Sequence, residues 1–307
     1  MPAQLIDGLH EVAARYDAFL LDQFGVLHDG TDVYAGVLDC LEALKQAGKR
    51  VVILSNSGTL QQPNRARLAR LGIPGDLYED FVTSGEVARA YLDSAPAELR
   101  GQARTGGARS AALRCLPLGA LRGGESERAI LQGLSIEEAA SVEEADFVMV
   151  ASFGQEPPPR DAYDDILKAA RARGLTLVCA NPDVKGVSPN GLIHAPGAIA
   201  ADYEAAGGKV VYIGKPHPLI YRHVLRDLAP IPASRVLAVG DSLSHDIAGA
   251  QGVGVASALV VEGIHHEELG DPPPAGSNGD GAFESRLAAL ERRYHAQADY
   301  IMRRLAW

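Results

Sequence analysis

Several apolar runs in this sequence end in side chains that can do chemistry. Asp22 ends the run "FLLD", and Asp241 ends "LAVGD", with Asp246 five positions later. Ser55 follows "VVIL", and Lys215 follows "VVYIG". A carboxylate in such a place can act as a nucleophile or bind Mg²⁺, and hydroxyl and ammonium groups can hold an anion. Nucleophile, metal ligands, phosphate donor and cation are the parts that phosphoryl transfer needs.

Each of these residues also has a purely structural interpretation. Asp22 could cap a turn, and Ser55 or Asp246 could cap the helix that follows it. Lys215 could be a solvated loop residue, although Pro216 restricts its backbone. The four motifs occur in the order Asp, Ser, Lys, Asp–Asp, and this combination favours the catalytic interpretation.

The segment "LSNSG" (54–58) adds further donors to this set. Ser55, Asn56 and Ser57 stand before a predicted helix, and the N-terminal end of a helix binds anions, phosphate above all. We therefore expect these three residues to contact the substrate.

The elements that must position these residues form an α/β fold with a mostly parallel sheet. Short apolar runs alternate with helical patterns, and the carboxyl ends of parallel strands face a common ligand crevice. Strands are predicted in "AFLLDQF", "RVVILSN", "LYEDFVTS", "DFVMVAS", "LTLVCAN", "VVYIG", "RVLAVGD" and "GVASALVV". Helices are predicted over 37–47, 62–71, 86–92, 162–172 and 218–228.

The length of 307 residues allows one large or two moderate domains, at about 100–200 residues per domain. We expect a discontinuous Rossmann-like core domain, residues 1–85 and 207–307. A second α/β domain, residues 86–206, would be inserted into it. The segment "RLAALERRYHAQADYIMRRLAW" (286–307) is amphipathic and predicts a C-terminal helical tail of the core domain.

Composition excludes several function classes. The net charge of −10 argues against a nucleic-acid partner, because phosphate backbones select basic surfaces. No stretch approaches the roughly 20 apolar residues of a membrane span, and the N-terminus has no signal-peptide core. The three cysteines are far apart and are expected to be reduced, which favours a cytoplasmic protein.

The motifs together resemble the haloacid dehalogenase superfamily, class IIA, a branch of sugar-phosphate, nucleotide and pyridoxal-phosphate phosphatases with an inserted α/β cap. They run in order from residue 19 to about 264. The matching segments are "LLDQFGVLHDG", "ILSNS", "TSGE", "ANPD", "PGAIAADYEAAGGKVVYIGKPHPLIY" and "VGDSLSHDIAGAQGVG". The resemblance implies that residues 86–206 are the cap. Because caps of this class often take part in dimers, the resemblance also implies a possible homodimer.

The resemblance assigns a role to each residue of the core. It implies that Asp22 attacks phosphorus to form a phosphoaspartate. Asp22, Asp241 and the backbone carbonyl of Phe24 would bind Mg²⁺, and Asp246 would support the metal's water shell. Lys215 would pair with the nucleophile and the phosphate.

The resemblance also implies which residues bind the substrate, a small phosphorylated metabolite. Ser55 would hold a phosphoryl oxygen, with Asn56 beside it. Asn181 and Asp183 of the "ANPD" segment (180–183) would face the substrate from the cap.

Phe24 departs from the superfamily's pattern. Phosphatases of this kind have an aspartate two positions after the nucleophile, which protonates the leaving oxygen and then activates water. In this respect the sequence resembles a subgroup of the superfamily with an aromatic residue at this position. The Phe24 side chain cannot shuttle a proton. The loss of a general acid–base typically costs about 10²–10⁴ in rate. His28 or Asp29 could replace it, although both are also typical turn residues before Gly30.

Three functional hypotheses follow. The first is a Mg²⁺-dependent phosphatase of a small phosphorylated metabolite, either slow or restricted to substrates whose good leaving groups need little protonation. The second is a non-catalytic protein that binds a phosphorylated metabolite. The third is a reaction that does not involve phosphate, which the Asp241 and Asp246 pair disfavours because dehalogenases of this superfamily need no metal.

Overall fold

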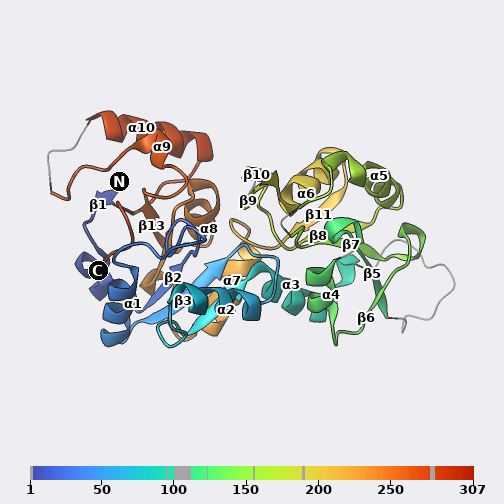
Figure 1. Cartoon of the computed structure of the whole chain (residues 1–307), viewed down its shortest axis with the longest axis horizontal. Coiled ribbons are helices and arrows are strands. Elements are labelled where there is room, and N and C mark those ends of the chain that lie inside the picture. The colour runs from blue at the N-terminus through green and yellow to red at the C-terminus, as the bar shows by residue number, and fades with distance from the viewer. Residues whose placement is uncertain are drawn as a thin grey trace. The chain divides into compact units, whose positions relative to one another are not determined.

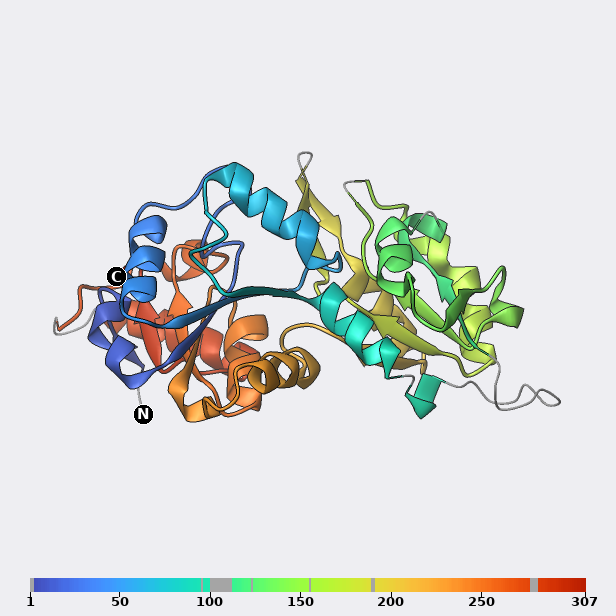
Figure 2. The same ribbon diagram turned by 90° about the horizontal axis from the view of Figure 1, so that it is seen from below.

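The structure is a computed structural model that describes residues 3–94, 96–99, 112–122, 124–154, 156–188, 191–276 and 281–307. The chain forms two compact units. Unit 1 comprises residues 1–55, 62–82 and 215–307, and unit 2 comprises residues 56–61 and 83–214. The chain passes from unit 1 into unit 2 where strand β4 runs directly into helix α3 (Figure 2).

Unit 1 is built on a seven-stranded sheet in the order β1-β14-β13-β12-β2-β3-β4 (Figure 1). The pairs β1–β14, β14–β13, β13–β12, β12–β2 and β2–β3 run parallel. The strands are β1 Gln4–Leu5, β2 Ala18–Leu21, β3 Arg50–Ser55, β4 Asp80–Thr83, β12 Val236–Gly240, β13 Ala256–Val260 and β14 Tyr300–Met302. The helices are α1 Val37–Gln46, α2 Gln61–Leu71, α7 Pro218–Asp227, α8 Ala248–Gly252, α9 His266–Leu269 and α10 Gly281–Tyr294.

Unit 2 has a five-stranded sheet in the order β11-β8-β7-β5-β6, and its pairs run parallel. An antiparallel pair, β9 with β10, accompanies it. The strands are β5 Leu113–Pro117, β6 Ile136–Glu138, β7 Phe147–Val150, β8 Thr176–Cys179, β9 Lys185–Ser188, β10 Gly191–His194 and β11 Lys209–Tyr212. The helices are α3 Ser84–Asp93, α4 Glu125–Leu131, α5 Asp164–Ala172 and α6 Pro196–Ala205.

The apolar runs form strands because central strands of a parallel sheet are covered on both faces. All residues of β2 and of β12 are buried. In α1 the buried residues are Val37, Cys40, Leu41 and Leu44, the spacing of one helical face. The predicted parallel α/β architecture is therefore confirmed, and each predicted strand is present, as β2, β3, β4, β7, β8, β11, β12 and β13.

The predicted helical tail is wrong over its second half. Helix α10 ends at Tyr294, and His295 takes a positive φ of 51°. Strand β14 follows, and it lies between β13 and β1, with Ile301 opposite Leu259. Periodicity cannot distinguish a run as short as "YIM" from a continuation of the helix. Its conformation is set by the tertiary contact, which is the pairing of β14 with β13 and β1.

The unit boundaries differ from the expected 86 and 206. Residues 56–61, 83–85 and 207–214 belong to unit 2 as well, and within that unit β11 pairs in register with β8. Within the described residues, no helix is long and apolar enough to cross a membrane.

Candidate active site

Three strands of unit 1 deliver the candidate side chains at one edge of the sheet. Asp22 follows β2, Ser55 ends β3, and Asp241 follows β12, and these strands are neighbours in the order β12-β2-β3. The backbone N–H of Asp22 donates to the carbonyl of Val239 at 2.9 Å, which extends the pairing of β2 with β12 to Asp22. The sheet therefore fixes the backbone at each site residue.

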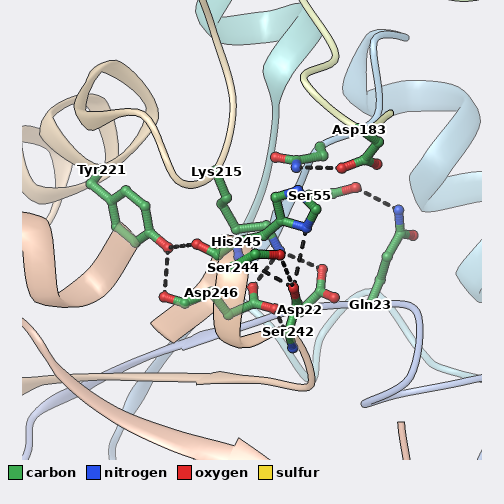
Figure 3. A network of polar contacts seen from close by, with 11 residues as sticks. Asp22, Gln23, Ser55, Asp183, Lys215, Tyr221, Ser242, Ser244, His245 and Asp246 are labelled. Atoms are coloured by element: carbon green, nitrogen blue, oxygen red, sulfur yellow. Dashed lines mark hydrogen bonds and ion pairs between the residues drawn. The ribbon is translucent and has the colours of Figure 1, made fainter. Parts of the chain in front are cut away.

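Lys215 is the centre of the site's ion pairs (Figure 3). Its Nζ donates to Asp22 Oδ1 at 2.6 Å and to Asp246 Oδ1 at 2.7 Å. The side chain of Lys215 is 4% exposed, that of Asp246 5% and that of Asp22 13%. Such buried, charge-assisted bonds orient carboxylates strongly. The predicted pairing of Lys215 with Asp22 is thus present in the structure.

The carboxylates of Asp22, Asp241 and Asp246 form an acidic cluster. One oxygen of each lies within 4.8 Å of the others. Backbone packs closely around the cluster: a Cβ on Gly25 (φ +78°) would lie 1.9 Å from Asp241 Oδ2, and one on Gly263 would lie 2.2 Å from the same atom. Only glycine fits these two positions, so the loops hold Asp241 against the cluster.

The electrostatics of the cluster favour an added cation. Burial raises the pKa of Asp22 to about 7, with Lys215 opposing and Asp246 reinforcing the shift. Burial, together with Asp22 and Asp246, raises the pKa of Asp241 well above its usual value. Burial would lower the pKa of Lys215, but the two adjacent carboxylates raise it, so Lys215 stays charged. Three carboxylates against one ammonium leave negative charge that a hard cation such as Mg²⁺ could neutralise through its preferred oxygen ligands.

Ser55 is buried next to the segment that carries Asp22. Gln23 Nε2 donates to Ser55 Oγ at 2.6 Å. This contact ties the residue after Asp22 to the end of β3. Sequence reasoning did not find Gln23, because an amide within an apolar segment carries no pattern of its own.

The other predicted substrate-binding residues lie in unit 2. Asn56 Nδ2 donates to Asp183 Oδ1 at 2.8 Å, and the backbone N–H of Asp183 donates to Asn181 Oδ1 at 3.0 Å. Ser57 Oγ is 2.9 Å from Thr59 Oγ1. The structure thus brings Asn56, Asn181 and Asp183 into one polar network. Their contact with a substrate stays a prediction.

Two further residues of the site, besides Gln23, escaped sequence reasoning. Tyr221 Oη donates to the backbone carbonyl of Asp246 at 3.1 Å, and Ser242 N donates to Asp246 Oδ2 at 3.1 Å. Asp246 itself sits in a π-helical turn, Leu243–Ile247. These contacts hold Asp246 in place. The contact of Tyr221 depends on how α7 packs beside the Asp246 turn, which no local sequence pattern encodes.

Neither His28 nor Asp29 is placed as a proton shuttle. His28 is fully buried, and burial together with Arg67 lowers the pKa of its imidazole to about 4. The Asp29 carboxylate accepts from the backbone N–H groups of Thr31 and Asp32, each at 2.8 Å, which lowers its pKa to about 2. Asp29 therefore stabilises a turn, and His28 is a neutral core residue.

Comparison with models of known protein families shows to which superfamily this chain belongs. A family model described as haloacid dehalogenase-like hydrolase matches residues 19–111, and a second, described as HAD-hydrolase-like, matches residues 212–278. The chain belongs to the haloacid dehalogenase superfamily. The two matches include Asp22, Ser55, Lys215, Asp241 and Asp246, so the superfamily assignment rests on the segments that build the site.

Relatives place this superfamily member in class IIA. Chronophin of Rattus norvegicus is 27% identical over 280 residues, which cover 83% of this chain and 80% of that protein. A crystal structure of a haloacid dehalogenase-like hydrolase from Brucella suis has a TM-score of 0.75 at 26% identity, covering 98% of this chain and 100% of that one. A glycerol phosphate phosphatase from Mycobacterium tuberculosis, solved in complex with magnesium, has a TM-score of 0.64 at 25% identity, covering 82% and 70%.

Proposed function

We propose that this protein is a Mg²⁺-dependent phosphatase that hydrolyses a small phosphorylated metabolite through a phosphoaspartate at Asp22. The observation that carries the proposal is the ammonium of Lys215, held at 2.6 Å from Asp22 and 2.7 Å from Asp246 inside an acidic cluster. Relatives with phosphatase names, among them the glycerol phosphate phosphatase of Mycobacterium tuberculosis, support the reaction class.

The residues divide the work of the first step. Lys215 binds Asp22 Oδ1 and leaves Oδ2 to attack phosphorus. The Asp22–phosphorus bond forms as the bond to the leaving oxygen breaks, and the electron pair stays on that oxygen. Ser55 would bind a phosphoryl oxygen, and Lys215 would balance the charge of the phosphoryl group. Water then attacks phosphorus, the bond between phosphorus and the Asp22 oxygen breaks, and the Asp22 carboxylate is restored as inorganic phosphate leaves with the proton of the water.

The acidic cluster of Asp22, Asp241 and Asp246 suits Mg²⁺. Asp22, Asp241 and the Phe24 carbonyl would hold the ion, and Asp246 would support its water shell. When bound, it would neutralise the charge of the phosphoryl oxygens. Asn56, Ser57, Asn181 and Asp183 would select the substrate, with unit 2 acting as the cap that excludes water.

Hydrolysis of a phosphatase panel tests this proposal. We expect Mg²⁺-dependent release of 4-nitrophenol from 4-nitrophenyl phosphate, its loss on chelation, and its return on addition of Mg²⁺. Asp22→Asn should abolish it while leaving the fold and the melting temperature near those of the wild type. Absence of turnover on every substrate, aryl phosphates included, would remove the enzymatic function.

A second candidate function is non-catalytic binding, and it is favoured by Phe24, because this residue stands where phosphatases of this kind have the aspartate that transfers protons. The protein would then bind a phosphorylated metabolite without turnover. Calorimetry with phosphorylated ligands distinguishes the two, because this function requires tight binding by the wild type with no phosphate release.

A further inference from the structure

Phe24 presents an exposed aromatic ring two residues after the nucleophile. Its side chain is 43% exposed, whereas the neighbouring Gln23 is buried. The edge of the ring meets His28, with the ring centroids 4.5 Å apart. The guanidinium carbon of Arg67 lies 5.7 Å from the centroid of the Phe24 ring. A position that cannot transfer a proton therefore carries a cation over its ring.

Ion pairing within the described part of the chain does not explain the place of Arg67. It lies on α2 and is partly buried, and burial, followed by the charge of Arg70, lowers the pKa of its guanidinium. A guanidinium nevertheless stays protonated in proteins. Among the residues that the structure describes, no carboxylate pairs with Arg67, although the neighbouring Arg65 binds Asp80 at 2.7 Å.

A packing role alone explains Arg67 poorly. A cation over an aromatic ring contributes only about 0.5–1 kcal/mol at an exposed site. The desolvation of a guanidinium opposes this gain unless an anion completes its surroundings. His28 does not supply one, because both of its ring nitrogens are buried and lack a hydrogen-bond partner among the described residues. A ligand that carries an anionic oxygen would complete the surroundings of the partly buried guanidinium.

We propose that Arg67 is a specificity-determining residue that binds the leaving oxygen and replaces proton donation by charge neutralisation. This rests on the proposed phosphatase function. As Asp22 bonds to phosphorus, the bond from phosphorus to the leaving oxygen breaks, the electron pair remains on that oxygen, and the resulting anion pairs with Arg67. No proton moves in this step.

This mechanism defines the substrate class. A leaving group that departs as an anion must be a weak base, since the guanidinium neutralises its charge but gives it no proton. Acyl phosphates, phosphoanhydrides, and aryl or enol phosphates meet this condition. Alkyl phosphates such as simple sugar phosphates do not, because their alkoxides are strong bases.

The test compares two aryl phosphates whose leaving groups differ in basicity. The ratio kcat/KM covers the steps through formation of the phosphoaspartate, so it reports the leaving group. In Arg67→Gln we expect kcat/KM for phenyl phosphate to fall by about 10²–10³, the usual cost of one lost transition-state contact to a developing oxyanion. For 4-nitrophenyl phosphate, whose anion needs less stabilisation, we expect a fall of at most about tenfold.

The matched control is Arg70→Gln, which removes an exposed arginine from the same helix and should leave both substrates within about twofold of the wild type. Guanidinium ion added to Arg67→Ala should restore phenyl phosphate hydrolysis more than 4-nitrophenyl phosphate hydrolysis. Circular dichroism confirms that each variant is folded.

The outcomes separate this inference from the proposed function. Equal losses for both substrates, or no loss, in a folded Arg67→Gln protein would overturn the inference and leave the phosphatase function standing. A wild-type protein without any aryl phosphate hydrolysis would overturn both.

Discussion

At the scale of single residues, the feature that most affects the proposed chemistry is Phe24, which cannot transfer a proton. Asp22, Lys215 and Asp246 make a tight charged group, yet the position that would carry the proton shuttle holds an exposed ring. The pKa of His28 is lowered to about 4, and Asp29 is engaged in a turn, so neither residue supplies the missing proton. In the proposed reaction, hydrolysis of the phosphoaspartate at Asp22 should therefore be slow, because neither residue activates the water.

Introducing a carboxylate at this position should therefore restore acid–base catalysis. We expect Phe24→Asp to raise kcat for phenyl phosphate by about 10², the lower end of the usual general acid–base contribution. A burst of phenol in the wild type, equal to the concentration of active sites, should disappear in the variant because hydrolysis of the phosphoaspartate would no longer limit turnover.

Phe24→Asn is the matched control for this change. It removes the ring and its contact with Arg67 but provides no titratable group, so it should not speed turnover. An unchanged kcat in a folded Phe24→Asp protein that still needs Mg²⁺ would show that the missing shuttle does not limit the rate.

At the scale of elements, the strands that carry the site were predictable, and the short elements that complete the sheets were not. Apolar runs rich in β-branched residues, such as "RVVILSN", favour a strand covered on both faces, and the polar residues that end them favour a strand of a parallel sheet. Strand β1 has two residues and β14 has three, too few for a periodic pattern. The position of Lys215 was predictable from the run before it, whereas the contact of Arg67 with Phe24 depends on the docking of α2, which no local pattern encodes.

Strand β14 gives a direct test of the corrected C-terminus. Ile301 is 2% exposed and packs in the cluster that includes Leu259 and Phe283. Ile301→Ala should lower the free energy of unfolding by about 2–5 kcal/mol, the usual cost of a large core truncation. Arg303→Ala, two residues on at the surface, should change it by less than about 1 kcal/mol. Similar values for the two variants in chemical denaturation would contradict the placement of β14.

A buried carboxylate in unit 2 predicts a pH-dependent stability. Glu127 on α4 accepts hydrogen bonds from the backbone N–H groups of Ala151 and Ser152 after β7, and its Oε2 has no partner among the described residues. Burial raises the pKa of Glu127, and the two N–H donors oppose the shift only in part. The folded state therefore holds a proton at pH values where the unfolded chain has lost it.

The raised pKa fixes the direction in which Glu127 makes the stability depend on pH. The contribution of Glu127 is fully present below its unfolded pKa, near 4.5, and is lost as the pH rises through its higher folded pKa. Denaturant unfolding of the wild type and of Glu127→Gln between pH 4 and 8 measures it. We expect stability to fall more with rising pH in the wild type than in the variant. Parallel pH profiles would show that Glu127 is ionised in the folded protein.

At the scale of the whole molecule, each unit has a core of its own. One buried cluster includes Phe19, Leu41 and Leu237, all from unit 1, and another includes Leu116, Val148 and Leu177, all from unit 2. The chain also enters and leaves unit 2 at neighbouring points, since a Cβ on Gly214 would lie 2.5 Å from Ser84 Oγ. An inserted domain of this kind can be exchanged without changing the order of the core elements.

Excision of most of unit 2 should therefore leave a folded catalytic core. We expect a chain in which a short Gly/Ser linker replaces residues 85–213 to unfold cooperatively, because the seven-stranded sheet and its packing clusters belong to unit 1. It should still release 4-nitrophenol with Mg²⁺, through Asp22 and Lys215, but lose the full chain's discrimination among substrates. The same excision in an Asp22→Asn background, which should release none, controls for contaminating phosphatases. A non-cooperative melting curve would mean that unit 1 depends on unit 2 for its fold, and unchanged discrimination would remove the substrate-selecting role from unit 2.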